Sequence, residues 1–124
     1  MNTTLLSQAL SQLPLIAILR GLTPAEAPSI GRALVDSGFA IIEVPLNSPE
    51  PLASIRALTD TFPQALIGAG TVLNVKQVHE VFAAGGRLIV APNFQPAVVA
   101  QALQLGMVVL PGVATPSEAF AAIE

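Results

Sequence analysis

Short apolar runs alternate along the chain with longer amphipathic stretches. Five runs rich in aliphatic and β-branched residues predict strands at residues 15–19, 40–44, 65–67, 88–90 and 107–110. In the stretches between them, apolar side chains recur at helical spacing, as at Ala27, Ile30 and Leu34. Because the runs are apolar throughout, they predict strands buried on both faces, which is typical of a parallel sheet.

Each predicted strand is followed by residues that favour the start of a helix. These residues combine an oxygen-bearing N-cap, an early proline or a Glu or Gln at the third position, as in TPAE (23–26), SPE (48–50), NVKQ (74–77), QP (95–96) and TPSE (115–118). Three amphipathic stretches end at Gly38, Gly85 and Gly106, where glycine suits a left-handed helix end. The repeat length of roughly 20 to 26 residues is typical of a β/α unit.

The repeat predicts a single α/β domain over residues 1–124, with a short docking helix at residues 1–13. Two architectures fit the periodicity. An open, doubly wound sheet could be complete at this length, whereas a TIM (β/α)8 barrel needs at least about 200 residues. A barrel would therefore be truncated here to about its first five β/α units.

Composition narrows the class of protein. Hydrophobic residues make up 52% of the 124 residues and charged residues only 10%, so the chain can bury a sizeable core. The net charge of −3 and the dispersed basic residues argue against a nucleic-acid or membrane-surface partner. No apolar run reaches the roughly 20 residues of a membrane-spanning helix. The absence of cysteine fits a reducing compartment, and we expect a cytoplasmic protein.

Polar residues at the ends of the predicted strands are the first candidates for chemistry, because parallel architectures bind ligands there. Arg20 ends the first strand, and Glu43 interrupts the second, where an unpaired charge would be costly. A salt bridge between the two would explain both without any function. Perturbed carboxylates at strand ends are nevertheless frequent at functional sites.

The remaining candidates have ordinary structural explanations beside the functional ones. Residues 68–71 (GAGT) form a small-residue turn in which backbone donors could approach an anion, or simply a tight connection. Pro92 and the neutral amide of Asn93 fit ordinary turn chemistry. The only lysine, Lys76, and the only histidine, His79, are predicted on a solvated helix surface, and no residue spacing indicates a metal site.

Taken together, five strand-end motifs resemble the aldolases of 2-keto-3-deoxy-6-phosphosugar acids, the KDPG/KHG aldolase family. The motifs are PLIAILRG (14–21), IEVPLNSP (42–49), IGAGTVL (67–73), IVAPN (89–93) and LPGVATPSE (110–118). The resemblance implies a TIM (β/α)8 barrel, usually trimeric, that forms a lysine Schiff base and releases pyruvate and glyceraldehyde 3-phosphate. It implies no metal and no cofactor.

The resemblance also assigns roles to individual residues. Glu43 matches the general acid/base, which moves protons through a water. Thr71 matches a residue that holds the pyruvoyl carboxylate, Pro92 matches a wall of that pocket, and Arg20 matches a cation suited to a carboxylate. Asn47 stands where gluconate-type members usually have arginine, and its context resembles the galactonate branch. The expected substrate is therefore 2-dehydro-3-deoxy-6-phosphogalactonate, with the 6-phosphogluconate or 4-hydroxy-2-oxoglutarate reaction as the alternative.

The resemblance places the imine-forming lysine on a sixth strand, beyond the TPSE helix in which the 124 residues end. We therefore expect this chain to lack the nucleophile and to be inactive alone. A different hypothesis is a non-catalytic half-barrel that associates with further copies to cover its open sheet edges.

Overall fold

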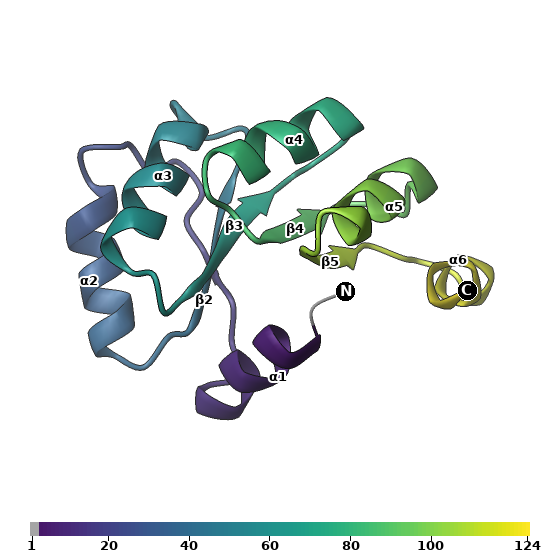
Figure 1. Cartoon of the computed structure of the whole chain (residues 1–124), viewed down its shortest axis with the longest axis horizontal. Helices are drawn as coiled ribbons and strands as arrows, with labels where there is room; N and C mark the ends of the chain where they lie inside the picture. Colours follow the sequence, from purple (N-terminus) through teal and green to yellow (C-terminus); the bar gives the residue numbers. More distant parts are fainter. Residues whose placement is uncertain (1–2) are drawn as a thin grey trace.

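The computed structural model describes residues 3–124 and consists of one sheet with helices on both of its faces (Figure 1). Met1 and Asn2, which belong to the predicted docking helix, lie outside the described residues. In chain order the elements are α1 (Thr3–Gln12), β1 (Ala17–Ile18), α2 (Ala27–Asp36), β2 (Ile41–Pro45), α3 (Pro51–Thr61), β3 (Leu66–Gly70), α4 (Val75–Ala83), β4 (Leu88–Ala91), α5 (Pro96–Gln104), β5 (Val108–Pro111) and α6 (Pro116–Ile123).

The five strands pair in parallel and in chain order, β1-β2-β3-β4-β5. A doubly wound sheet reverses its strand order at a switch point, whereas a barrel adds each strand beside the previous one. The described chain therefore consists of about five consecutive units of a (β/α) barrel, and the doubly wound alternative is wrong. All five carboxyl ends lie along one edge of the sheet.

Side chains alternate between two hydrophobic clusters, one on each face of the sheet. Ile42, Val44 and Ile67 point toward α2 to α5, where they pack with Leu58 and Phe62. On the opposite face the strand residues pack against α1, in a cluster that contains Ala9, Ala40, Ile41, Leu66, Leu88 and Val108. Figure 1 shows α2 to α5 along one side of the sheet and α1 on the other.

The predicted strands are correct in number, and three of them have bounds within one residue of the prediction, whereas β1 and β3 differ more. β1 is only two residues long, Ala17 and Ile18, which pair with Ile42 and Glu43 of β2, and Leu15, predicted within the strand, is exposed. β3 continues to Gly70, so Gly68 and Gly70 lie within the strand and the predicted turn begins only at Thr71. The two glycines do not mark a turn, because their lack of a side chain allows close packing within the sheet.

Three helix-start predictions are correct, since α4 begins after Asn74, α5 after Gln95 and α6 after Thr115. The Asn74 carboxamide oxygen accepts a hydrogen bond from the Gln77 amide, and Thr115 and Glu118 form a complete capping box. The SPE start is wrong, because α3 begins two residues later, at Pro51, after Glu50 in a left-handed conformation (φ 42°). The TPAE residues form a turn closed by Thr23 and Glu26, and α2 itself begins at Ala27.

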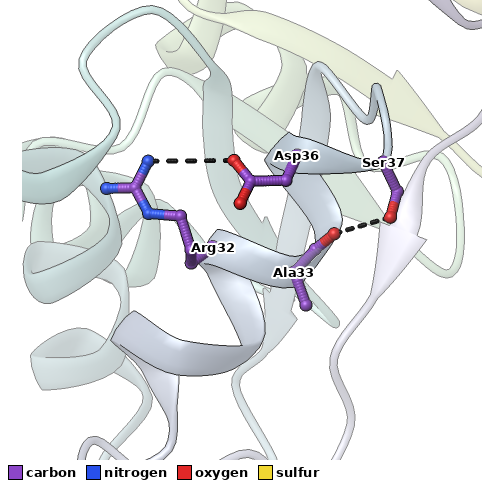
Figure 2. Close-up of polar contacts among 4 residues, drawn as sticks. All are labelled: Arg32, Ala33, Asp36 and Ser37. Carbon is purple, nitrogen blue, oxygen red and sulfur yellow. Dashed lines mark hydrogen bonds and ion pairs between the residues drawn. The ribbon is translucent and has the colours of Figure 1, made fainter.

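The last turn of α2 is held by local polar contacts on its exposed side. The Arg32 guanidinium lies 4.0 Å from the Asp36 carboxylate, and the Ser37 hydroxyl donates to the Ala33 carbonyl over 2.7 Å (Figure 2). Gly38 follows α2 with φ 97°. Gly85 and Gly106 have positive φ as well, at the ends of α4 and α5. These three helix ends confirm the glycine prediction. Within residues 3–124 there is no helix long and apolar enough to cross a membrane.

Candidate active site

The predicted site residues lie at the carboxyl edge of the sheet. Arg20 follows β1, Glu43 lies in β2, Asn47 follows β2, Thr71 follows β3 and Pro92 follows β4. The register places Glu43 beside Ile18 of β1 and Gly68 of β3, and Pro45 beside Gly70. Because the strands are adjacent and parallel, all five residues share the edge at which barrels bind their ligands.

Glu43 is the only charged side chain that is buried in the described part of the chain, with 4% of its surface exposed. One carboxylate oxygen, Oε2, is buried without a hydrogen-bond partner. Desolvation raises the pKa of Glu43 above its ordinary value, and the charge of Arg20 and the Gly70 backbone lower it in part. The side chain is therefore a carboxyl group with an enhanced tendency to hold a proton and with a free acceptor.

Gly70 provides the space in which the Glu43 carboxylate lies. A β-carbon at position 70 would fall against both carboxylate oxygens, at far less than van der Waals distance. Gly68, two residues earlier in β3, allows close approach to β4, because a β-carbon there would collide with the backbone of Leu88. The two glycines therefore let β3 pass close to its neighbours and leave the carboxylate at the face of the sheet.

Arg20 acts on Glu43 by its charge and not by direct contact. The ion pairs of residues 3–124 within 4.0 Å are those of Arg32 with Asp36 and Lys76 with Glu80. The salt bridge considered as a purely structural explanation of Arg20 and Glu43 is therefore not formed. Instead the exposed Arg20 head group lies close enough to attract the Glu43 carboxylate and remains available to an anion.

Thr71 adopts a strained backbone conformation at the end of β3. Its φ is 58°, one of two positive values among the non-glycine residues of the described chain. A β-branched residue in the left-handed region costs of order 1–3 kcal/mol, and such strain concentrates at functional sites. A hydrogen bond ties the residues after this turn to α4, because the Gln77 carboxamide oxygen accepts from the Leu73 amide at 2.7 Å.

Pro92 and Asn47 are exposed at the same edge of the sheet. The residue after β5, Gly112, packs closely against the Pro92 loop. Its amide donates to the Ala91 carbonyl over 2.8 Å, and a β-carbon at Gly112 would collide with the Pro92 carbonyl. Asn47 lies in the turn after β2. The structure thus gathers the five predicted residues along one edge, and it brings Glu43 directly against β3.

Lys76 and His79 lie on α4, and both are exposed to solvent. The Lys76 side chain is 84% exposed and pairs with Glu80 at 3.5 Å, so it has the solvated environment of an ordinary surface lysine. His79 is exposed. Among residues 3–124 no three His, Asp or Glu side chains converge in a way that could hold a metal ion.

Sequence reasoning missed Gly70 and Ser48 as parts of the site. Gly70 was assigned to a turn, although a glycine inside a strand pattern is a signal of close approach. Ser48 was assigned to a helix start, whereas its buried hydroxyl accepts a hydrogen bond from the Gly21 amide, 27 residues away. No local pattern indicates that contact.

A buried carboxyl with a raised pKa, a cation that attracts it and the Pro92 loop lie at the carboxyl ends of consecutive barrel strands, where barrels bind their ligands. The family model for KDPG and KHG aldolases matches residues 6–124. The chain belongs to this aldolase family, whose members are carbon–carbon lyases.

Individual relatives agree with this assignment. The probable 2-dehydro-3-deoxy-6-phosphogalactonate aldolase of Rhizobium meliloti (strain 1021) is 54% identical over 110 residues, which is 88% of this chain and 52% of that protein. The native KDPGal structure superimposes with a TM-score of 0.88 at 50% identity, covering 90% of this chain and 55% of that one.

A more distant solved structure is KDPG aldolase from Legionella pneumophila with pyruvate captured as a covalent carbinolamine. Its TM-score is 0.85 at 30% identity, over 93% of this chain and 56% of that one. The chain spans about half the length of the relatives it matches.

Proposed function

We propose that this chain forms the acid/base and carboxylate-binding portion of a class I aldolase site that cleaves 2-dehydro-3-deoxy-6-phosphogalactonate to pyruvate and glyceraldehyde 3-phosphate. The observation that carries the proposal is the buried Glu43 carboxyl, which has an unpartnered oxygen and lies in the space that Gly70 leaves at the strand ends. A buried carboxyl with a raised pKa suits proton transfer near neutral pH.

In this reaction a lysine amine adds to the keto carbon of the substrate and gives a carbinolamine, which loses water to form an imine. Glu43 gives the proton that the departing hydroxyl needs. Glu43 then accepts the proton of the C4 hydroxyl while the C3–C4 bond breaks. The electrons of that bond move into the imine. Returning that proton to C3 gives the pyruvate imine, and hydrolysis releases pyruvate and the lysine.

Arg20 and Thr71 are assigned to the substrate carboxylate. Arg20 offers a permanent cation beside Glu43, and the strained Thr71 turn presents its hydroxyl at the end of β3. Pro92 forms an apolar wall beside them. This assignment is supported by the shared edge of the sheet and by the pyruvate adduct of the Legionella pneumophila relative.

The preference for the galactonate substrate rests on Asn47 and on the similarity to the Rhizobium meliloti relative. An amide at position 47 hydrogen-bonds without adding charge, unlike the arginine expected of gluconate-type members. The epimer 2-dehydro-3-deoxy-6-phosphogluconate is the alternative substrate. Cleavage rates of both epimers, measured on a barrel completed by the missing segment of a relative, distinguish the two.

The imine-forming amine is assigned to a lysine outside residues 1–124, because Lys76 is solvated and paired with Glu80. Incubating the chain alone with pyruvate and borohydride should leave its mass unchanged. A reduced pyruvate adduct on Lys76 would contradict the assignment.

The acid/base role is tested by supplying the rest of the barrel in trans, as the segment of the Rhizobium meliloti relative that this chain does not match. We expect the recombined barrel to release pyruvate, and Glu43→Gln to slow release by at least about 100-fold, the usual contribution of a general acid/base. Glu50→Gln, which changes an exposed carboxylate on the neighbouring loop, is the matched control and should retain activity. Equal rates for both variants would refute the role of Glu43.

We also propose that the protein works as a homo-oligomer, a trimer in the resembling family. Large apolar side chains stay exposed on α6, where Phe120 is 70% and Ile123 81% exposed. Because residues three positions apart lie on the same side of a helix, the two side chains form an apolar surface that a second copy could cover.

A further inference from the structure

Ser48 is a buried polar residue in the turn that follows β2. It is 7% exposed, whereas Asn47 and Pro49 on either side of it are exposed. Its own amide donates to the Pro45 carbonyl over 2.9 Å, which closes a tight turn at the end of the strand. The turn therefore points the Ser48 side chain inward, away from solvent.

The Ser48 hydroxyl oxygen accepts a hydrogen bond from the Gly21 amide at 3.1 Å. Gly21 follows Arg20 directly and has φ 81°, in the left-handed region that glycine adopts without strain. The Leu22 amide closes the same turn by donating to the Leu19 carbonyl over 3.3 Å. Ser48 thus ties the loop after β1 to the loop after β2.

The contact between Ser48 and Gly21 adds to the strand pairing that holds the Arg20 segment beside β2. The ladder between β1 and β2 continues as far as the Leu19 amide, which donates to the Glu43 carbonyl over 2.9 Å. Within residues 3–124 no carboxylate lies within 4.0 Å of the Arg20 guanidinium. The place of Arg20 relative to Glu43 is consequently set by its backbone, which the Gly21 amide anchors.

We propose that Ser48 is a positioning residue, whose buried hydroxyl anchors the Gly21 amide and thereby holds Arg20 beside the Glu43 carboxylate. The inference rests on the proposed function only in treating Arg20 as the anchor of the substrate carboxylate. Without the hydroxyl, the Gly21 amide loses its acceptor, the turn loosens, and the Arg20 charge spends less time near Glu43.

The test is a titration of the Glu43 side-chain carboxyl carbon by NMR, which requires no catalysis. Ser48→Ala should raise the midpoint toward that of Arg20→Gln, because both remove attraction from the Arg20 charge. Ser48→Thr keeps the hydroxyl and should restore the midpoint of the unsubstituted chain. A serine with a merely structural role would alter stability and leave this midpoint in place, and an unmoved midpoint in Ser48→Ala overturns the proposal.

Hydrogen exchange of the Gly21 amide in the unsubstituted chain decides the matter if Ser48→Ala does not fold. Slow exchange supports the anchor, and exchange at the rate of an open amide refutes it.

Pyruvate affinity separates the proposed role of Ser48 from the proposed function. In the recombined barrel, Ser48→Ala should weaken it about fivefold, the worth of one hydrogen bond, and Ser48→Thr should restore it. If no variant binds pyruvate, the proposed function fails, while the titration still judges Ser48.

Discussion

The side chain of Glu43 shows how one residue can serve the site at the expense of stability. It lies among strands that are otherwise apolar, and its unpartnered oxygen gains nothing from the fold. The attraction of Arg20 offsets only some of the desolvation, since the pKa of Glu43 remains raised. A carboxyl group in this state is suited to exchanging protons with a ligand.

The raised pKa of Glu43 determines how its contribution to stability changes with pH. Because the folded state binds the proton more tightly than the unfolded state, the contribution is most favourable below the ordinary value of 4.5 and is lost as the pH rises through the folded-state value. Glu43→Gln should therefore stabilise the protein at pH 8 by about 1 kcal/mol and much less at pH 4. Urea unfolding at both pH values measures this, with Glu50→Gln as control. An equal gain at both pH values would contradict it.

Gly70 is expected to be intolerant of a side chain because of Glu43. Gly70→Ala should destabilise the fold by about 2 kcal/mol, since the new methyl group falls on the carboxylate oxygens. In a Glu43→Ala background the same substitution should cost clearly less. A double-mutant cycle from denaturant unfolding measures the difference. The same cost in both backgrounds would show that the strain arises elsewhere.

At the scale of elements, α2 and α3 pack closely because a glycine of α2 lies where the two helices meet. Gly31 of α2 faces α3, where a β-carbon would lie 2.6 Å from both Leu58 and Phe62. Both side chains are fully buried and cannot move aside freely. The Arg32 guanidinium covers the Phe62 ring at 4.7 Å from its centroid, which closes the contact on the solvent side.

Gly31→Ala is a direct test of this helix contact. Alanine favours a helix over glycine by roughly 0.5–1 kcal/mol, but overpacking a full core costs about 1–3 kcal/mol. The net result should be a loss of about 1 kcal/mol, measured by thermal or urea unfolding. Ser29→Ala, on the exposed side of the same helix, should change stability much less. A stabilised Gly31→Ala protein would show that α2 and α3 can move apart.

At the scale of the whole molecule, the sheet formed by residues 3–124 has β1 at one edge and β5 at the other. Apolar side chains accompany them, since Ile18 of β1 is 60% exposed and Phe120 lies on the uncovered α6. Unpaired strand edges and exposed apolar side chains both favour association. Figure 1 shows α6 standing apart from the helices that cover the sheet.

We expect this protein to sediment as a homo-oligomer whose association constant depends on α6. Replacing Phe120 and Ile123 by serine should weaken association by at least about tenfold, because roughly 1.5–3 kcal/mol is associated with burying each large apolar side chain. Leu103→Ser on α5, at 40% exposure, is the control. A well-folded monomer at high concentration in the unsubstituted chain would contradict the expectation.

The number of strands, the glycine helix ends and the caps at Asn74 and Thr115 could be predicted from the sequence by itself. These features depend on residues within a few positions of one another, so a linear pattern records them. The motifs at the strand ends also indicated the aldolase family and the candidate site residues.

Only the tertiary structure decided which residues support the site. The structure places Gly70 against the Glu43 carboxylate and joins Ser48 to Gly21. It also shows that Arg20 and Glu43 form no salt bridge. Each of these relations links segments about 23 to 27 positions apart, through the register of parallel strands. Local patterns carry no record of that register, because it is set by how the strands and their covering helices pack together.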